Sequence, residues 1–527
     1  MSDITEVAPE LSTQPAPAEP PARFGVIGWW RWIWRTLTSM RTALILLFLL
    51  ALAAIPGSVL PQRGNNALNV AKYYQQHPHL APVLNRFSLF DVFAARWFAA
   101  IYILLFTSLA GCVVPRSWQH FRALRARPPA PPRRLDRLPH SDSWHTTVPT
   151  QTVYDAMYAT LRARRFRVDR HATGLAAEKG YLRETGNLVF HLALLLLLAG
   201  VALGGLVGYK GTRLVVEGDG FANAEGAYDS WHHGRLTSAS SLTPFTLHLD
   251  KFDATYVEAG AKIGEARSFD AHVHYQPKPG APTRSADIRS NHPLTVGGAR
   301  VYLVGHGYAP HFIVRDDTGR IAFDGAVPFL PQDGNFDSTG VIKVPDARPQ
   351  QLGFSGFFAP TAVPTSRGFV SVFPGPRNPG VVLLAYRGNL GLDSGVPQSV
   401  YALDDARLTR VATAALGIGD VMKLPDGKAT LTYVGLDQWA SFQVTYDPGK
   451  QIVLIAAVVM IAGLLLSLRI RRRRVWARVS NDESGTTVVE AAGLGRTDSG
   501  AFEEEFADLV AELRQATQQG SSEGTGA

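Results

Sequence analysis

Residues 187–208 read NLVFHLALLLLLAGVALGGLVG and contain no Lys, Arg, Asp or Glu. About 20 helical residues cross a bilayer core of roughly 30 Å, so this run is long enough and apolar enough to span a membrane. Three further runs in the 527-residue chain have the same character: residues 42–60, 97–114 and 451–468. The sequence therefore predicts a multi-pass α-helical membrane protein with four spans.

Lys and Arg beside the spans predict the orientation of the chain, because these residues are enriched on the cytoplasmic side of membranes. Basic residues precede the first and third spans and follow the second and fourth, and residues 469–478 hold six arginines. Residues 209–450 have no basic run beside either neighbouring span. We therefore expect a cell-membrane protein with both termini in the cytoplasm and residues 209–450 on the extracytoplasmic side.

The net charge of +8 does not point to nucleic acid, because much of the excess lies beside the spans. Positive charge at these positions indicates the orientation of the spans and contact with anionic lipid headgroups. Membrane lipid is therefore an expected partner and nucleic acid is not. Cys112 is the only cysteine. The extracytoplasmic segment therefore contains no disulfide and no cysteine-based metal cluster, and its own core must hold it together.

The composition of the segments around the spans predicts the domain organisation. A Trp- and Arg-rich run at residues 29–35 suits the lipid headgroup layer, and an aromatic box for a cofactor is the alternative. We expect a small helix and a short strand in the cytoplasmic loop, and an amphipathic helix at residues 502–516 in a Gly- and Ser-rich tail. The predicted order is a disordered and interfacial cytoplasmic N-terminus (1–40, with 1–22 disordered), the first two spans with a short outer loop (41–114), a basic cytoplasmic loop (115–186), the third span (187–208), the extracytoplasmic domain (209–450), the fourth span (451–468) and the cytoplasmic tail (469–527).

The extracytoplasmic segment has strand signals along its length. Residues 245–250 alternate apolar and polar side chains, and the apolar runs at residues 301–304 and 381–386 suit buried strands. Gly- and Asp-rich turns such as residues 218–220 and 316–319 separate these runs. The segment is therefore expected to form a large, mainly-β domain of sandwich or barrel-like type.

His191 is the most informative single residue, since it lies within the third span about one helical turn from its cytoplasmic end. Neutral imidazole ligates iron, and an ionisable residue inside a membrane usually marks a site. The alternative is a histidine near the headgroups that hydrogen-bonds to another helix. The chain has no Walker loop, Rossmann fingerprint, HExxH or nucleophile elbow, and no CxxCH for covalent haem attachment.

Two further residues are candidates for cofactor binding. Cys112 lies near the cytoplasmic end of the second span and is either a thiolate ligand, a reactive thiol or a small apolar residue. His306 lies in the sequence GHGY, where flanking glycines permit close approach by a partner. Its alternative is a surface or turn histidine, because it has no carboxylate or cysteine companions at metal-ligand spacing.

Several segments, in this order on the four-span topology, together resemble the ResB family, also called CcsB, of the system II pathway of c-type cytochrome maturation. The resemblance covers most of residues 41–478. The segments that carry it are IPGSVLPQ (55–62), FDVF (90–93), Gly111-Cys112 with Pro115-Arg116, GYLRETGNLVFH (180–191) and GHGYAP (305–310).

The resemblance implies a role in haem delivery. Proteins of this family work with a ResC/CcsA-type partner, which carries a Trp-rich haem-handling segment, to bring haem across the membrane and join it to the CxxCH thiols of apocytochrome c. This chain lacks that segment, since its Trp cluster at residues 29–34 is cytoplasmic and off-pattern. The chain would then be a non-autonomous subunit of a haem-ligation complex.

The resemblance also implies roles for the candidate residues. His191 would be an axial ligand of the iron of haem b, held transiently and shared with a histidine of the partner. Cys112 stands where some relatives contact haem, and the domain that contains His306 would position apocytochrome or close over the partner's haem site. The thioether bonds need haem vinyl groups and substrate thiols rather than a nucleophile from this chain, so its contribution would be positioning.

The alternative function is a membrane-anchored β-domain receptor or structural envelope protein that binds no cofactor. A transporter that acts alone is disfavoured, because the four spans show little inverted-repeat structure and no charged midplane residue.

Overall fold

The computed structural model describes residues 25–519 except 65–66, 366–367, 393–398, 426, 484 and 496–498. The N-terminal segment predicted to be disordered and the Gly- and Ser-rich end after residue 519 lie outside the described residues. The chain divides into two compact units, one of Met1–Leu198 with Val453–Ala527 and the other of Ala199–Ile452.

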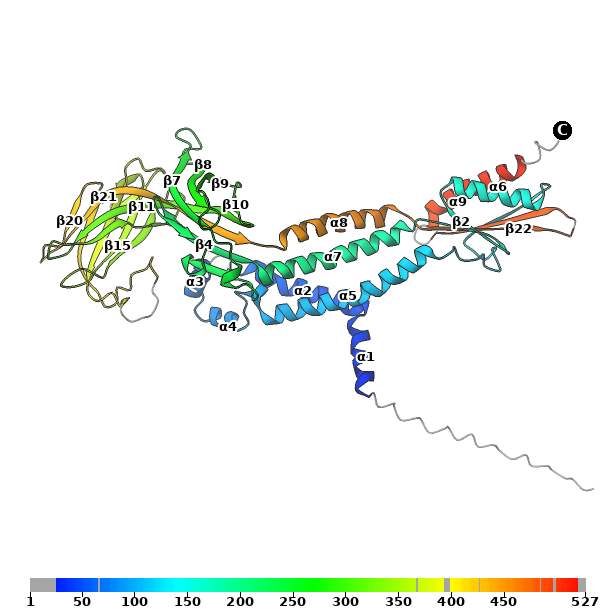
Figure 1. The fold of residues 1–527 in the computed structure, drawn as a ribbon, viewed down its shortest axis with the longest axis horizontal. Coiled ribbons are helices and arrows are strands. Elements are labelled where there is room, and N and C mark those ends of the chain that lie inside the picture. Colours follow the sequence, from blue (N-terminus) through cyan, green and yellow to red (C-terminus); the bar gives the residue numbers. More distant parts are fainter. Residues whose placement is uncertain are drawn as a thin grey trace, which may run out of the picture. The chain divides into compact units, whose positions relative to one another are not determined.

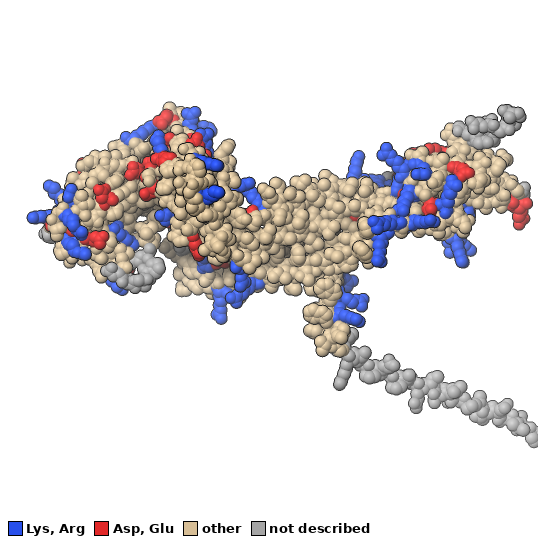
Figure 2. Space-filling model, viewed as in Figure 1, with Lys and Arg blue, Asp and Glu red and all other residues tan. Residues whose placement is uncertain are grey.

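Four helices of the described chain are long and apolar enough to cross a membrane (Figure 1). They are α2 (Met40–Val59), α5 (Arg96–Arg125), α7 (Leu182–Val207) and α8 (Lys450–Arg469). Most of their residues are not buried by the rest of the chain, which suits contact with lipid. Figure 2 agrees, since the visible face of these helices is nearly free of charged side chains. The prediction of a multi-pass helical membrane protein is confirmed.

Helix α1 (Val26–Leu37) precedes the first span and carries the predicted aromatic and basic run. All four of its tryptophans are exposed, and the least exposed, Trp34, is still 48% accessible. These indole rings therefore form no enclosed aromatic box within the described residues. Their exposure suits the headgroup layer of a membrane.

Spans α7 and α8 pack closely through glycines. A Cβ added to Gly186 would lie 2.7 Å from the Gly463 carbonyl oxygen, and one added to Gly463 would lie 2.8 Å from the Phe190 amide nitrogen. Small residues permit this close approach between membrane helices. The contact fixes the half of α7 that carries His191.

The segment between α2 and α5 forms three short helices, α3 (Ala67–Gln76), α4 (Leu80–Arg86) and η1 (Val92–Ala94). Residues of α3 and α4 pack around the buried ring of Phe90. The Gln62 side chain donates to the Leu89 carbonyl at 3.0 Å and accepts from the Val92 amide at 3.1 Å. These bonds join the IPGSVLPQ and FDVF segments, so a structural role is sufficient to explain both motifs.

The described parts of the predicted loop and tail form one α/β domain. Its antiparallel five-stranded sheet has the order β1-β23-β22-β3-β2, and helices α6 and α9 pack on it (Figure 1). The elements are β1 (His140–Thr146), α6 (Thr150–Ala163), β2 (Arg167–His171), β3 (Gly174–Lys179), β22 (Arg473–Asn481), β23 (Thr487–Gly495) and α9 (Ser499–Gln519). This differs from the expected separate loop and tethered tail helix, because β22 pairs with β3 across nearly 300 residues of sequence.

The amphipathic face predicted for the tail is buried in the core of this α/β domain. Phe502, Phe506, Leu509, Val510 and Leu513 are each less than 7% exposed. They pack with apolar side chains of α6 and of the central strands. The helix is therefore an integral part of a folded domain.

The large β domain fills most of the second unit, and the prediction of a mainly-β domain is confirmed. Its largest sheet has the order β10-β11-β21-β4-β6, with β12 on β11 and β20 on β21; further sheets have the orders β13-β14-β15-β18-β19, β5-β7-β8-β9 and β16-β17. The strands are β4 (Tyr209–Val216), β5 (Gly220–Ala222), β6 (Ser230–His233), β7 (Thr246–Tyr256), β8 (Ala266–Gln276), β9 (Arg284–Arg289), β10 (Leu294–Val296), β11 (Ala299–Arg315), β12 (Ile321–Ala326), β13 (Leu330–Pro331), β14 (Ser338–Val344), β15 (Leu352–Ala359), β16 (Ala362–Thr365), β17 (Gly368–Ser371), β18 (Gly380–Arg387), β19 (Thr409–Gly417), β20 (Val421–Lys423) and β21 (Thr430–Tyr446), with 3-10 turns η2 (Glu225–Ala227) and η3 (Ala239–Ser241).

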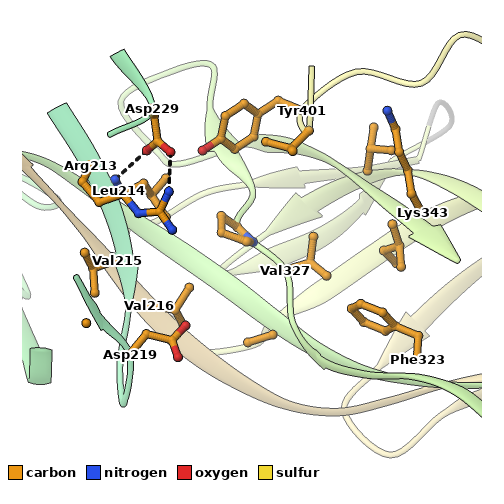
Figure 3. Close-up of a pocket in the computed structure, with 16 residues that line it drawn as sticks. Arg213, Leu214, Val215, Val216, Asp219, Asp229, Phe323, Val327, Lys343 and Tyr401 are labelled. Carbon is orange, nitrogen blue, oxygen red and sulfur yellow. Dashed lines mark hydrogen bonds and ion pairs between the residues drawn. The ribbon is translucent and has the colours of Figure 1, made fainter. Parts of the chain in front are cut away.

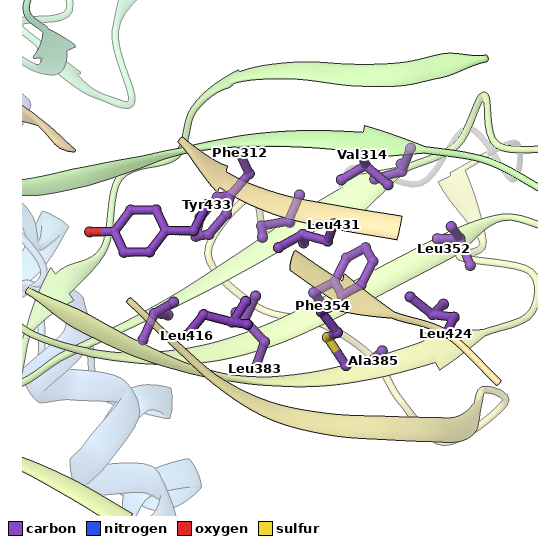
Figure 4. Close-up of a cluster of buried hydrophobic side chains, with 14 of the residues drawn as sticks. Phe312, Val314, Leu352, Phe354, Leu383, Ala385, Leu416, Leu424, Leu431 and Tyr433 are labelled. Atoms are coloured by element: carbon purple, nitrogen blue, oxygen red, sulfur yellow. The ribbon is translucent and has the colours of Figure 1, made fainter. Parts of the chain in front are cut away.

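Two large hydrophobic cores stabilise the β domain, beside a smaller cluster around Trp439, and strands β11 and β21 contribute to both large cores. One core contains Phe312 and Tyr433 together with apolar residues of the β14–β15–β18 sheet (Figure 4). The other contains Val301 and Phe442 with residues of β7 and β8. Each of these strands is 17 residues long, so one half serves each core. This arrangement replaces the disulfides that the domain lacks.

Candidate functional site

A mostly apolar cavity of about 500 Å³ lies among α2, α5 and α7. Leucines from all three helices make up half of its lining residues. The polar residues in its lining are Cys112, Arg116, Asn187 and His191. Cofactor and small-molecule sites have volumes of roughly 300–1,000 Å³, so the cavity has a suitable size. The structure thus brings together His191 and Cys112, which the sequence singled out on different spans.

The His191 imidazole is fixed by its own helix. Its Nδ1 lies 2.7 Å from the Asn187 carbonyl oxygen one turn earlier, and this oxygen can only accept a hydrogen bond. The proton therefore sits on Nδ1, which leaves the Nε2 lone pair available to a metal. A backbone carbonyl that orients the imidazole in this way is the usual companion of a metal-ligating histidine.

Cys112 is engaged differently. Its thiol donates to the Thr38 carbonyl oxygen at 2.6 Å, at the junction between α1 and α2. A sulfur that donates carries its proton, whereas a metal ligand is a thiolate. In this arrangement Cys112 connects two helices and forms part of the cavity wall.

The donor set fits haem better than a bare metal ion. A haem iron needs only axial ligands from the protein, and the porphyrin suits apolar walls. A divalent cation needs several protein ligands, and no group of three or more His, Cys, Asp or Glu in the described part of the chain is arranged to hold one. His191 would hold the iron, and the leucine-rich wall would hold the macrocycle.

The segment before His191 ties α7 to the α/β domain. The Tyr181 hydroxyl donates to Glu178 at 2.5 Å, and Arg472 donates to both Glu178 and Glu184. Burial raises the pKa of Glu178, but hydrogen bonds from Arg472 and Tyr181 outweigh it and hold that pKa below its usual value. The same burial raises the pKa of Tyr181 to about 12. Tyr181 and Glu184 of the GYLRETGNLVFH segment thus anchor the start of the α7 span to the α/β domain.

His306 belongs to the other compact unit and does not line this cavity. Its ring contacts Phe252, Phe269 and Phe336, with centroids 4.4–5.0 Å apart. Burial lowers the pKa of His306 to about 4, so the ring is neutral at physiological pH. Gly307 gives room to Trp439, whose ring would lie 2.5 Å from an added Cβ. Gly307 therefore has a packing role that needs no external partner, whereas a Cβ added to Gly305 would meet only the Ser441 Cβ at an ordinary 3.6 Å.

The β domain contains a cleft of about 620 Å³ between strands β4 and β14 (Figure 3). On its β4 side, Arg213 pairs with Asp229, whose other oxygen accepts from the Leu214 amide at 2.7 Å. Lys343 lies on the opposite side, and the Tyr401 hydroxyl points toward Asp229. Burial lowers the pKa of Lys343.

Strand β14 has an open edge at this cleft, whereas the edge of β4 is partly covered, because Asp229 accepts from the Leu214 amide and the Asp219 amide donates to the Val216 carbonyl. β6 pairs with β4 only over residues 209–212, and β13 pairs with β14 only at Ser338 and Thr339. Within the described chain, no strand continues either pairing along residues 213–216 or 340–342. Open strand edges can accept an extended polypeptide as an added strand.

These features define a four-span membrane protein that combines a histidine-lined apolar cavity between its helices with a large β domain. A model of the ResB-like family matches residues 40–507, and the chain belongs to this family, as the sequence motifs predicted.

Curated relatives agree with this assignment. The chain is 24% identical to a "Cytochrome c biogenesis protein CcsB" of Thermosynechococcus vestitus, over 92% of this chain and 96% of the relative. It is 26% identical to a protein of the same name from Synechococcus sp. (strain JA-3-3Ab), over 90% of this chain and 88% of the relative. These similarities support a role in cytochrome c biogenesis.

Sequence reasoning missed two residues of the cavity. Asn187 was noticed only as part of a motif, yet its carbonyl orients His191. Arg116 was interpreted only as a topology signal, yet it lines the cavity. Each lies four residues from a recognised candidate on the same helix, and this spacing places both members of a pair on one helical face.

Proposed function

We propose that this chain binds haem b between its spans and, with a ResC/CcsA-type partner, delivers it for covalent attachment to apocytochrome c. The observation that carries the proposal is the His191 imidazole, which lines an apolar cavity and has its Nδ1 bonded to the Asn187 carbonyl. The names of the curated relatives support the pathway. The haem would be held transiently and shared with a histidine of the partner.

The contribution of this chain is positioning. His191 would hold the iron and the leucine-rich walls would exclude water, while α8 supports α7 through close contacts at Gly186 and Gly463. When bound, haem supplies the vinyl groups that react with the substrate thiols. The chain needs no nucleophile of its own and acts as a subunit of a haem-ligation complex.

The proposed orientation has both termini and the α/β domain in the cytoplasm and the β domain on the extracytoplasmic side of the cell membrane. It is supported by the basic residues beside the spans, many of which gather on the α/β domain (Figure 2). Helix α1 would lie in the lipid headgroups through its exposed tryptophans.

In this scheme the β domain receives apocytochrome c. An unfolded substrate can offer an extended strand, and the cleft between β4 and β14 offers the open edge of β14 to receive it. The same cleft would serve the alternative function, a membrane-anchored receptor without a cofactor, so the two hypotheses differ in the cavity and not in the β domain.

Gene deletion followed by complementation tests the proposal. Loss of the chain should remove c-type cytochromes from a haem-stained gel, and the wild-type gene should restore them. His191→Ala should fail to restore them, whereas Leu192→Ala, an exposed neighbour outside the cavity lining, should succeed. Normal c-type cytochromes in the deletion strain would contradict the proposal and favour the receptor.

A further inference from the structure

The cavity among α2, α5 and α7 has a polar end and an apolar end. Contacts fix the direction of the helices: Arg116 meets Met40 at 3.0 Å, His120 meets Thr185 at 2.9 Å, and Tyr102 meets Leu198. Spans α2 and α7 therefore run opposite to α5. The end where α2 and α7 begin carries Arg116 and Asn187 in its lining, and the other end carries Leu50, Leu105 and Leu198.

Arg116 is a cation without a carboxylate. Its guanidinium contacts the Met40 sulfur, a weak acceptor, and no ion pair of Arg116 occurs among the described residues. Arg122 and Arg125, farther along α5, instead lie over the rings of Trp118 and Phe121. Arg472 has two carboxylate partners. Arg116 thus offers its planar hydrogen-bonding fork to a ligand in the cavity.

The position of Arg116 relative to the candidate iron ligand is informative. Four residues, or about 6 Å of helix, separate Arg116 from Cys112 and Asn187 from His191. His191 therefore lies deeper in the cavity than the polar rim. A porphyrin held at its centre by His191 would extend its edge toward Arg116 at one end and toward the leucines at the other.

We propose that Arg116 binds the carboxylate edge of the porphyrin and sets its orientation in the cavity. The inference rests on the proposed function and deepens it, since it assigns the ligand class as an anionic, carboxylate-bearing macrocycle. Guanidinium groups bind carboxylates with charge-assisted, often bidentate hydrogen bonds. The carboxylates lie at the Arg116 end, and the apolar edge of the ring lies among Leu50, Leu105 and Leu198.

A paired-ligand titration tests this role. The full-length chain would be purified in detergent from cells that also express the proposed partner, stripped of haem, and titrated with haem and with haem dimethyl ester, in which both carboxylates are blocked. Arg116→Met should weaken haem binding about tenfold to hundredfold, the range for a charged hydrogen bond. It should leave binding of the ester unchanged, and Arg116→Lys should retain part of the preference for haem.

The matched control is Arg122→Met, which removes a cation from the same helix outside the cavity lining and should affect neither ligand. Equal weakening of haem and ester by Arg116→Met would reveal a structural role and overturn the proposal. Unchanged haem affinity would overturn it as well, and would leave Arg116 as a residue for lipid headgroups or topology.

The His191→Gly variant separates this inference from the proposed function. If His191 holds the iron, this variant should alter the Soret spectrum of both haem and the ester, whereas Arg116→Met should not alter the ester spectrum. A wild-type chain that binds neither compound would contradict the proposed function and the inference together. Normal spectra in His191→Gly with an Arg116-dependent preference for haem would contradict only the ligand assignment.

Discussion

The substitution His306→Phe should remove a pH dependence from the stability of the β domain. In the folded domain this imidazole is surrounded by three phenylalanine rings, and its Nδ1 is buried without a hydrogen bond in the described structure. The nearby phenols of Tyr256 and Tyr308 have pKa values raised by burial and stay neutral. No charged partner therefore stabilises a protonated ring.

The magnitude follows from the pKa of His306, which falls from 6.5 to about 4 because burial disfavours the charged form. Between these pH values the unfolded chain binds the proton and the folded chain does not. The free energy of unfolding of the β domain is therefore unaffected by His306 above pH 6.5 and decreases as the pH falls below it. Each unit corresponds to about 1.4 kcal/mol, which gives about 2 kcal/mol lost by pH 5 and about 3 kcal/mol by pH 4.

Thermal unfolding of the full chain in detergent, followed by intrinsic fluorescence at pH 7.5 and pH 5.0, measures this effect. A loss of 2 kcal/mol corresponds to about 4–8 °C in Tm for a domain of this size. His306→Phe should reduce the acid-induced fall in Tm by that amount, whereas the exposed His292→Gln should not. An equal fall in wild type and His306→Phe would refute the assigned burial of His306.

Three further changes probe other parts of the chain. Cys112→Ser should keep the haem content and Soret maximum of the purified protein, because we expect the thiol to remain bonded to the Thr38 carbonyl and not to ligate the iron; a displaced maximum would restore Cys112 as a ligand. Phe502→Ala should destabilise the α/β domain by about 3–5 kcal/mol, because it empties part of a closed core, and unchanged resistance to proteolysis would contradict that packing. Val341→Cys, in a Cys112→Ser background, should form a mixed disulfide with a thiol of apocytochrome c when diamide is added as the two-electron oxidant, whereas Ile418→Cys, outside the cleft, should not; equal capture by both would argue against the cleft.

The spans were predictable because a membrane imposes a simple length and polarity condition that each run satisfies by itself. The α/β domain could not be predicted in this way, because its sheet joins strands from distant segments of the chain. The charged residues in these strands also hide the usual strand pattern. Arg473 is only 2% exposed and pairs with Glu505, yet it belongs to the arginine run that signals topology. Strand pairing at such separation leaves no local pattern in one sequence.

The candidate site was likewise predictable only in part from the sequence. His191 and Cys112 stood out because polar or reactive residues are uncommon inside spans, and the structure places both in one cavity. Their roles could not be assigned from sequence, because they depend on the carbonyls of Asn187 and Thr38. At His306 the flanking glycines suggested access, whereas Gly307 in fact accommodates Trp439.

Chemical rescue of His191→Gly tests the assignment of the iron ligand most directly. The haem-loaded wild-type protein and the variant would be compared by absorption spectroscopy, with and without added imidazole. We predict that the variant loses the wild-type Soret position and that free imidazole restores it by occupying the vacated place, while Leu192→Ala behaves as wild type. A variant spectrum identical to wild type without imidazole would contradict the assignment of His191 as the haem ligand.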